Sequence, residues 1–318
     1  MGKLARYFWP KCGLLFYMAQ ERIEAAFGFF EKGSLQIELR RTFSPKEKEE
    51  LFDWYRQIRQ TYPRLYVVSM MDTFNQGALP GCGSRTFEKY GIDEALSRHI
   101  CFQKQWSAYV SLVEIKWFEE KFKGIELDLL YSPFILLYQH VYPHLDETPG
   151  IYILHQNSML YMMVLSKDRL WYAHATAVLH SQAQGAVEAG LDTDEADDLA
   201  FDLELLEEEE GAEILENNMI KKSLKEEGIA EEEADRDDLA LLEYNLNLYE
   251  EVKETIGRYY RDDRYEQTFI QKAMLYDTEG KVNDFTRYVK DELFMPAERE
   301  IFDPIDAMAR LAVKEVGG

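Results

Sequence analysis

Apolar residues near the start of the chain come in short runs separated by polar turns. Three such runs lie close together, "GLLFYMA", "IEAAFGFF" and "LQIELRRTF", with only "QER" and "EKGS" between them. Runs this close predict an antiparallel meander of three strands. A helix should follow over "SPKEKEELFDWYRQIRQTY", because Ser44 with Glu47 three residues later forms a capping box. The apolar run "RLYVVSMM" then predicts a buried strand.

The next part of the chain alternates between strand-like and helix-like segments. The stretch "NQGALPGCGSRTFEKYGIDEALSRHICF" is rich in glycine at first and predicts irregular structure followed by a helix. After it come a strand, "WSAYVSLV", a helix ended by Gly124, "EIKWFEEKFKG", a strand, "IELDLLY", and a helix with a Ser-Pro start, "SPFILLYQHVY". This alternation is typical of strands covered by helices in an α/β fold.

The second half of the chain repeats the same plan. Residues 149 to 178, "PGIYILHQNSMLYMMVLSKDRLWYAHATAV", predict a hairpin of two apolar strands joined by "KDR". A long amphipathic helix, a strand and a helix follow in "ALLEYNLNLYEEVKETIGRYYRD", "TFIQKAMLYD" and "VNDFTRYVKDEL", and a last helix begins after "FDPID". A meander followed by alternating helices and strands, present twice, is the layout of the actin-like fold.

The negative charge is concentrated in one segment. The whole chain has a formal net charge of −23. Residues 186 to 243 hold 23 Asp or Glu against 4 Lys or Arg, a net charge of −19, so the other residues together carry only −4. Apolar residues recur there at helical intervals, which predicts helices with acidic outer faces. Such faces are typical of a solvated surface or of a docking site for a basic partner.

Several classes of protein are disfavoured by what the sequence lacks. There is no basic stripe to neutralise phosphates, so we do not expect nucleic-acid binding. No apolar run is long enough to cross a bilayer, and the N-terminus lacks a signal-peptide core, so the protein is expected in the cytoplasm. Cys12, Cys82 and Cys101 are widely scattered and are expected to be reduced thiols.

Metal and enzyme motifs are also missing. His140 and His144 could chelate a metal if both were helical, but Pro143 between them favours a helix end, and no metal site is expected. GxSxG, P-loop and GxGxxG motifs are absent. Asp72, at the end of the strand "RLYVVSMM", stands where catalytic acids occur in α/β folds, although an Asp at the start of a loop is commonplace. We therefore assign no catalytic residue.

The order of elements resembles one branch of the actin-like fold in particular. "WSAYVSLVEIKWFEEKFKGIELDLLYSPFILLYQHVY", the hairpin of residues 149 to 178 and the closing "FDPID" resemble the PilM-like proteins, and the related cytoplasmic part of GspL-like proteins. The resemblance implies a two-lobed actin-like (ribonuclease H-like) α/β fold, with mixed sheets flanked by helices. The lobes would be residues 1–145 and 146–318. A small subdomain would be inserted at about 75–131, and the acidic helical insertion would occupy about 186–243.

The nucleotide-binding elements of this fold are degenerate here. Members that bind ATP generally carry an Asp-x-Gly turn in each hairpin, because glycine admits the phosphates and the carboxylate organises magnesium. The first hairpin has "YMAQERIE" instead, and the second has His155, Gln156 and Asn157. A Gly-Gly turn is replaced by "LYDTEGKVNDF", with Gly280 and Lys281 as the remaining candidates for nucleotide contact. We therefore expect no bound cofactor, and ATP is disfavoured.

The hairpin turn gives a testable expectation. If it has lost phosphate binding, its tip should be held by packing and local hydrogen bonds, and His155, Gln156 and Asn157 should face a cleft too narrow or too poor in donors for a triphosphate. Replacing all three with alanine should then cost no more than about 0.5 kcal/mol, the usual cost of a surface substitution.

The resemblance implies a non-catalytic cytoplasmic scaffold of a type IV pilus or type II secretion platform, peripheral to the inner membrane. Its partners would be a bitopic inner-membrane protein of the PilN or GspM type and the platform of the motor ATPase. A peptide of the bitopic partner would dock on the inserted subdomain, where Trp106, Tyr109 and Trp117 are the candidate contacts, although core packing explains these residues equally well. The alternatives are an actin-like ATPase or sugar-kinase relative that still binds or hydrolyses ATP, and an adaptor that holds a basic protein on the acidic segment.

Overall fold

The structure is a computed structural model that describes residues 9–46, 48–178 and 233–316. The chain divides into one compact unit of residues 1–178 and 248–318 and another of residues 179–247. Most of the predicted acidic helical insertion therefore lies outside the described residues. From residue 233 onward the chain forms one long helix, α7 (Glu233–Arg261).

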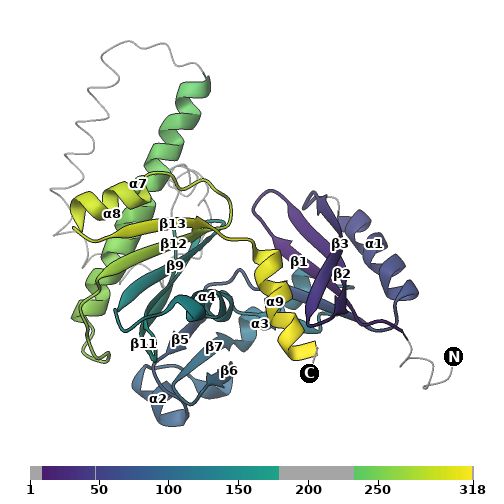
Figure 1. The fold of residues 1–318 in the computed structure, drawn as a ribbon, viewed down its shortest axis with the longest axis horizontal. Helices are drawn as coiled ribbons and strands as arrows, with labels where there is room; N and C mark the ends of the chain where they lie inside the picture. Colours follow the sequence, from purple (N-terminus) through teal and green to yellow (C-terminus); the bar gives the residue numbers. More distant parts are fainter. Residues whose placement is uncertain (1–8, 47, 179–232, 317–318) are drawn as a thin grey trace, which may run out of the picture. The chain divides into compact units, whose positions relative to one another are not determined.

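The first sheet has the predicted meander at one side and parallel strands at the other (Figure 1). Its order is β3-β2-β1-β4-β8, with the bounds β1 (Cys12–Met18), β2 (Ile23–Glu31), β3 (Ser34–Phe43), β4 (Leu65–Met70) and β8 (Leu129–Tyr131). Side chains of β1 alternate between two cores, as a buried strand requires. Leu14 and Phe16 pack in one core with α1 (Lys48–Thr61) and α3 (Leu112–Lys121), and Leu15 and Tyr17 pack in the other.

The second sheet repeats the order of the first, β11-β10-β9-β12-β13. Its strands are β9 (Gly150–Gln156), β10 (Met159–Ser166), β11 (Arg169–Ala177), β12 (Lys272–Asp277) and β13 (Ala297–Ile301). The prediction of two strands over residues 149 to 178 was wrong, because a tight turn at Asn157 and Ser158 divides the first of them into β9 and β10. The two equal strand orders confirm the repeated plan.

A third, smaller sheet has the order β5-β7-β6, with β5 (Gln76–Leu79), β6 (Ser97–Phe102) and β7 (Trp106–Ser111). It also carries the short helix α2 (Ser84–Lys89). The helix predicted after the glycine-rich residues is present only as α2, and the end of the same stretch pairs with β7 as strand β6. The small sheet ends at residue 111, earlier than the predicted limit of 131, since β8 pairs with β4 in the first sheet.

A disulfide joins Cys82 to Cys101 within the small sheet, with 5.8 Å between their Cα atoms. The expectation of three reduced thiols is therefore wrong for two of them. Their separation of 19 residues carries no motif, and only the pairing of β6 with β7 brings Cys101 back to the loop before α2. Cys12 is free and buried, and burial raises the pKa of its thiol to about 11.

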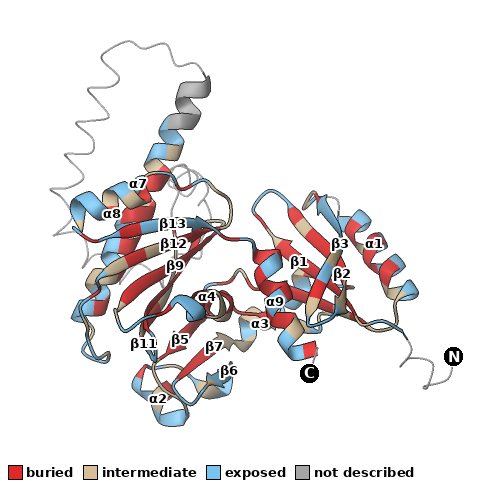
Figure 2. Cartoon of the chain, in the orientation of Figure 1, coloured by how far each residue is buried: buried red, intermediate tan, exposed pale blue. Residues whose placement is uncertain are grey.

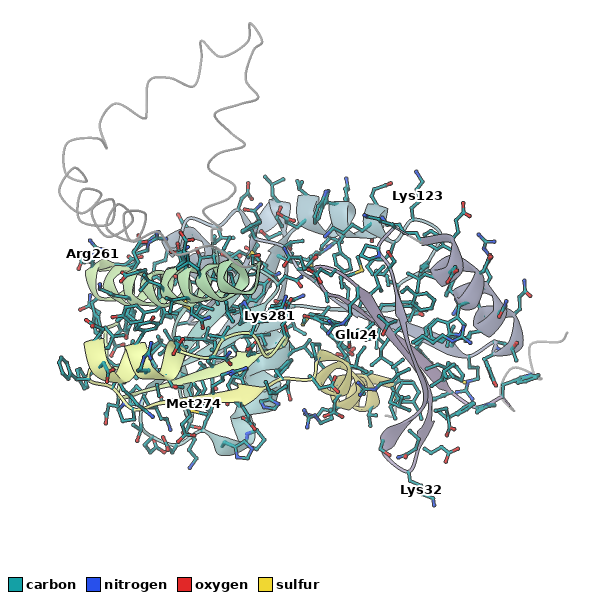
Figure 3. The ribbon with its side chains drawn as sticks, turned by 90° about the horizontal axis from the view of Figure 1, so that it is seen from above. Glu24, Lys32, Lys123, Arg261, Met274 and Lys281 are labelled. Carbon is teal, nitrogen blue, oxygen red and sulfur yellow. A yellow bond between two sulfur atoms is a disulfide. The ribbon has the colours of Figure 1, made fainter. Side chains whose placement is uncertain are left out.

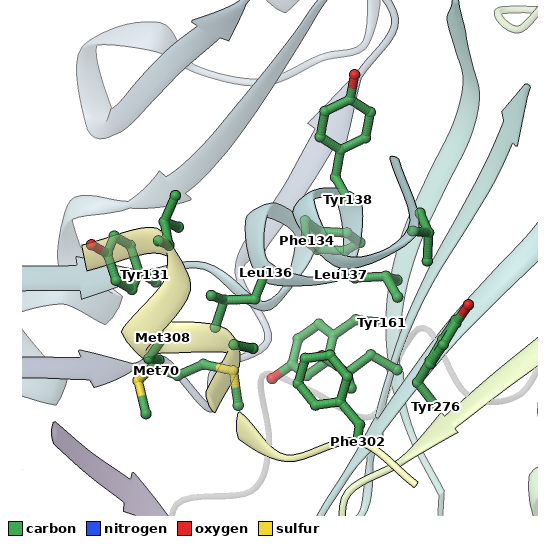
Figure 4. Packing of buried hydrophobic residues seen from close by; sticks show 14 of the residues in the cluster. Met70, Tyr131, Phe134, Leu136, Leu137, Tyr138, Tyr161, Tyr276, Phe302 and Met308 are labelled. Carbon is green, nitrogen blue, oxygen red and sulfur yellow. The ribbon is translucent and has the colours of Figure 1, made fainter. Parts of the chain in front are cut away.

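The two large sheets pack on a shared core that contains α4 (Pro133–Val141) and α9 (Pro304–Val316). Figure 4 shows Phe134 and Leu137 of α4 beside Tyr161 of β10 and Phe302. Figure 2 shows that the buried residues continue along the central strands of both sheets. Among the described residues, no helix has both the length and the apolar character that crossing a bilayer requires.

The disulfide gives a prediction about stability. Replacing Cys82 and Cys101 with alanine should lower the free energy of unfolding by roughly 3 kcal/mol, because the unfolded chain regains the entropy of a 19-residue loop. Thermal unfolding with and without a thiol reductant measures it. The reductant should lower the transition temperature of the unmodified protein and leave that of the double variant unchanged. If the unmodified protein and the double variant had equal transition temperatures, both with and without the reductant, the disulfide would not form.

Candidate functional site

The hairpin turns of the two large sheets meet across a narrow junction. Asn157, in the turn after β9, has a φ of 56° and donates from Nδ2 to the carbonyl of Met18 at the end of β1, at 3.1 Å. Tyr17 of β1 donates from its hydroxyl to Oγ1 of Thr278, just after β12, at 3.0 Å. Lys281, labelled in Figure 3, lies in the loop that follows. The turns that face a nucleotide in ATP-binding relatives are thus bonded directly to one another.

Asp277, the last residue of β12, is a buried charge that directly precedes Thr278 of this junction. It is fully buried, and its Oδ1 lies 3.1 Å from Nδ1 of His155 on the neighbouring strand β9. Its Oδ2 lies 3.1 Å from a guanidinium nitrogen of Arg299 on β13. The backbone amides of Glu279 and Val282 donate to the two carboxylate oxygens at 3.0 Å each. The carboxylate therefore has a bonded partner on every side.

These contacts determine the protonation of Asp277. Burial by itself raises the pKa of the carboxyl. The hydrogen bonds from His155 and from the amides of Val282 and Glu279 outweigh burial and hold the pKa of Asp277 below its ordinary value of 3.8. Asp277 is therefore an ionised, structural carboxylate at neutral pH.

The second hairpin turn is packed, and two of its three candidate side chains are buried. His155 is 1% exposed and Gln156 is 0% exposed. The physical reason is that β9 lies between β10 and β12, so its last residues are inside the sheet and not at its edge. Among the described residues, neither the Nε2 nor the Oε1 atom of the Gln156 side chain has a hydrogen-bond partner.

The predicted candidates in the third loop lie close to Asp277. Gly280 has a φ of 74°, a conformation that favours glycine, and it lets the loop return so that Val282 reaches the carboxylate. Lys281 forms an ion pair with Glu279 at 2.7 Å. Sequence reasoning missed Asp277 and Arg299. One signal was available in the sequence, because Asp277 ends a predicted strand. An Asp in that position favours a turn in which its side chain accepts a hydrogen bond from the backbone amide two residues later, here Glu279.

The three predicted partner contacts lie in different environments. Trp106 is buried in the core, where it stacks on Phe102 with ring centroids 4.5 Å apart, so it is not available to a partner. Tyr109 is half-buried on the small sheet. Trp117 on α3 is 51% exposed, with Nζ of Lys121 3.8 Å from its ring centroid.

A trough runs between the small sheet and β11. It consists of two adjoining cavities of about 400 and 470 Å³, which share Ile92, Tyr109, Ala173 and His174 in their walls. Phe74 and Leu96 line one end and are 56% and 62% exposed. Exposed apolar side chains around a depression are typical of a binding surface.

Other candidates from the sequence have structural roles. Lys121 binds both carboxylate oxygens of Asp72 at 3.0 Å. His140 is in the last turn of α4 and His144 in the 3₁₀ turn beyond it, as the intervening proline predicted. The described residues contain no group of three or more His, Cys, Asp or Glu side chains placed to hold a metal ion.

Two family models match the sequence. Domain of unknown function (DUF8569) matches residues 9–138, and Domain of unknown function (DUF8341) matches residues 151–317, more than half of the chain. The chain belongs to the DUF8341 family. A comparison with curated proteins gave no match.

Solved structures resemble this DUF8341 member over nearly its whole length. A PilM-PilN type IV pilus biogenesis complex is 11% identical, with 97% of this chain and 98% of that chain covered and a TM-score of 0.52. A protein of actin-like ATPase fold and unknown function from Bacteroides thetaiotaomicron is 8% identical, with 98% of both chains covered and a TM-score of 0.47. The first likeness, together with the two equal strand orders, confirms the predicted actin-like fold.

Because side chains of the hairpin turn are buried, we no longer expect every substitution there to have the same small effect on the free energy of unfolding. His155→Ala should lower the free energy of unfolding by about 1–3 kcal/mol, because it removes a buried partner of Asp277. Gln156→Met should instead be neutral or stabilising, because it removes two buried polar atoms that lack partners in the described structure. Denaturant unfolding of the two variants distinguishes them. If both variants lowered the free energy of unfolding by the same small amount, the side chains of the turn would be exposed and not buried.

The depressed pKa of Asp277 gives a pH dependence. Its contribution to stability is present above the ordinary carboxyl pKa and is lost as pH falls through the lower pKa of the folded state. Between about pH 5 and pH 2, the unfolding free energy of the unmodified protein should fall more steeply than that of Asp277→Asn. Asp263→Asn, in an exposed loop, serves as the control. Parallel curves for the protein and Asp277→Asn would contradict the assignment.

Proposed function

We propose that this chain is a non-catalytic actin-like scaffold that holds a partner protein. The observation that carries the proposal is the bonding of Asp277. A carboxylate that is already bonded to His155, Arg299 and two amides is not available to organise magnesium or a triphosphate. The direct bond from Tyr17 to Thr278 closes the same junction from the side of the first sheet.

The residues at the junction do not fit ATP. A triphosphate site needs free backbone amides or cations facing an open space. Here the amides of Glu279 and Val282 are used by Asp277, and Lys281 is neutralised by Glu279. The trough cavities are lined by other residues and lie beside the small sheet. We therefore propose no nucleotide-dependent reaction for this chain.

The partner we propose is a bitopic inner-membrane protein of the PilN or GspM type, in an assembly with a secretion or pilus motor. The chain would then act at the cytoplasmic side of the inner membrane. The support is the likeness to a protein that forms a PilM-PilN complex. The docking surface would be the trough, which Phe74 lines, together with Trp117, which is exposed on the helix that directly follows β7. The disulfide between Cys82 and Cys101 restricts the proposed cytoplasmic location, because such bonds persist in a cytoplasm mainly in hyperthermophiles.

The first test is nucleotide binding. A ligand that binds only the folded state raises its stability by RT ln(1 + [L]/Kd). Millimolar Mg-ATP should leave the thermal transition unchanged, and phosphate release should equal that of buffer. A transition raised by Mg-ATP, together with hydrolysis that Asp277→Asn abolishes, would favour the ATPase alternative and contradict the scaffold.

The second test is partner docking. Phe74→Ala and Trp117→Ala should each weaken binding of the partner's cytoplasmic peptide about tenfold, by removing exposed aromatic contacts. Phe294→Ala is the matched control, because Phe294 is 88% exposed but lies in the loop between α8 (Phe285–Glu292) and β13. Calorimetric titration of the peptide into each variant provides the measurement. If the control weakens binding and the other two do not, docking occurs elsewhere.

A further inference from the structure

The trough has one end rich in arginine. Arg258 and Arg261 of α7 and Arg264 of the following loop line its larger cavity, with Asp262 as the only acidic residue among the lining residues. Arg264 is committed to Asp262, at 2.7 Å, and to the carbonyl of Tyr90. The lining therefore carries two positive charges in excess, on a chain whose net charge is −23.

The two helix arginines differ in their bonding. Arg258 binds Glu254 on its own helix and lies 3.3 Å from Nε2 of His174. Arg261 donates to the carbonyl of Gly257, and no carboxylate partner for it occurs among the described residues. Arg261 lies at the C-terminal end of α7 (Figure 3). Its guanidinium has donors available for a ligand, and guanidinium groups bind carboxylates with two parallel hydrogen bonds.

Tyrosine rings form the walls beside these arginines. Tyr265 contacts Tyr90 and Tyr172, with ring centroids 4.6 and 4.8 Å apart. Burial raises the pKa of Tyr172 to about 12, so its phenol stays neutral. Burial also lowers the pKa of His174, and nearby Arg258 lowers it further, so the imidazole is neutral near pH 7. The positive charge of this end therefore comes from the arginines alone.

The opposite end of the trough has a mixed lining that includes apolar side chains. Phe74, Ile92 and Leu96 line it, and Asp93 is its only charged lining residue. The walls between the two ends come from β5 and β11. β5 and β11 are each an edge strand of their own sheet, and these two strands lie next to each other. Side chains of an extended peptide can enter pockets along such a wall.

We propose that the trough binds an extended acidic peptide segment of a partner protein. An Asp or Glu side chain of the peptide would lie at Arg261, since Arg258 is already paired with Glu254, and apolar side chains would lie at Phe74 and Leu96. This inference rests on the proposed docking function and adds the chemistry of the ligand. Charge complementarity of this kind gives specificity and faster association, because the rest of the protein repels an acidic segment that is misplaced.

Selection from a random peptide display library on the folded, full chain tests the proposal. The same library is applied to Arg261→Glu, to Arg258→Gln/Arg261→Gln, and to Lys253→Glu as the control. Lys253 is a cation of the same helix that does not line the trough. Thermal unfolding of each variant verifies that it is folded. Peptides retained by the unmodified protein and the control but lost on the arginine variants should be enriched in Asp and Glu.

Binding of one selected peptide should weaken about tenfold on Arg261→Glu, which equals about 1.4 kcal/mol. The peptide with each Glu changed to Gln should lose affinity on the unmodified protein but not on Arg261→Glu. Selected peptides that require Phe74 but show no acidic excess would overturn the acidic ligand and leave the docking function intact. Failure to select any peptide that depends on Phe74 or Arg261 would overturn both.

Discussion

The ion pair and hydrogen bonds around the carboxylate of Asp277 organise the end of the second sheet that faces the first sheet. A buried carboxylate without partners would cost several kcal/mol, so the surrounding chain is constrained to supply them. His155 comes from β9, Arg299 from β13, and the two amides from the loop after β12. One side chain thus connects three neighbouring strands with the loop whose Thr278 binds Tyr17.

This constraint explains why the repeated fold need not bind a nucleotide to hold its halves together. In an actin-like protein that binds ATP, the phosphates and the metal bridge the two hairpin turns. Here Asn157 binds the carbonyl of Met18, and Tyr17 binds Thr278, so protein atoms make the bridge. The shared core around α4 and α9 joins the sheets behind it. The trough beside the small sheet is open, which fits the proposed role in binding another protein.

The sequence was sufficient to predict the plan of the fold, because β1 and β9 carry long apolar runs and the helices begin at clear signals such as Ser132-Pro133. It was not sufficient for the small sheet. β6 is mostly exposed and has no alternating apolar pattern, so only its pairing with β7 and the bond from Cys101 to Cys82 define it. The sequence did not reveal the partner of His155. His155 stood out in the sequence, but its partner Asp277 is 122 residues away, and only the parallel pairing of β9 and β12 brings them together.

Hydrogen exchange of the backbone amides at the junction measures the central claim most directly. The account predicts that the amides of Thr278, Glu279 and Val282 exchange slowly in the protein without nucleotide, because each is bonded to His155 or Asp277. Their rates should be unchanged by saturating Mg-ATP. Rapid exchange in the free protein that becomes slow only when Mg-ATP is added would contradict the account, since it would mean that the nucleotide, and not Asp277, organises the junction.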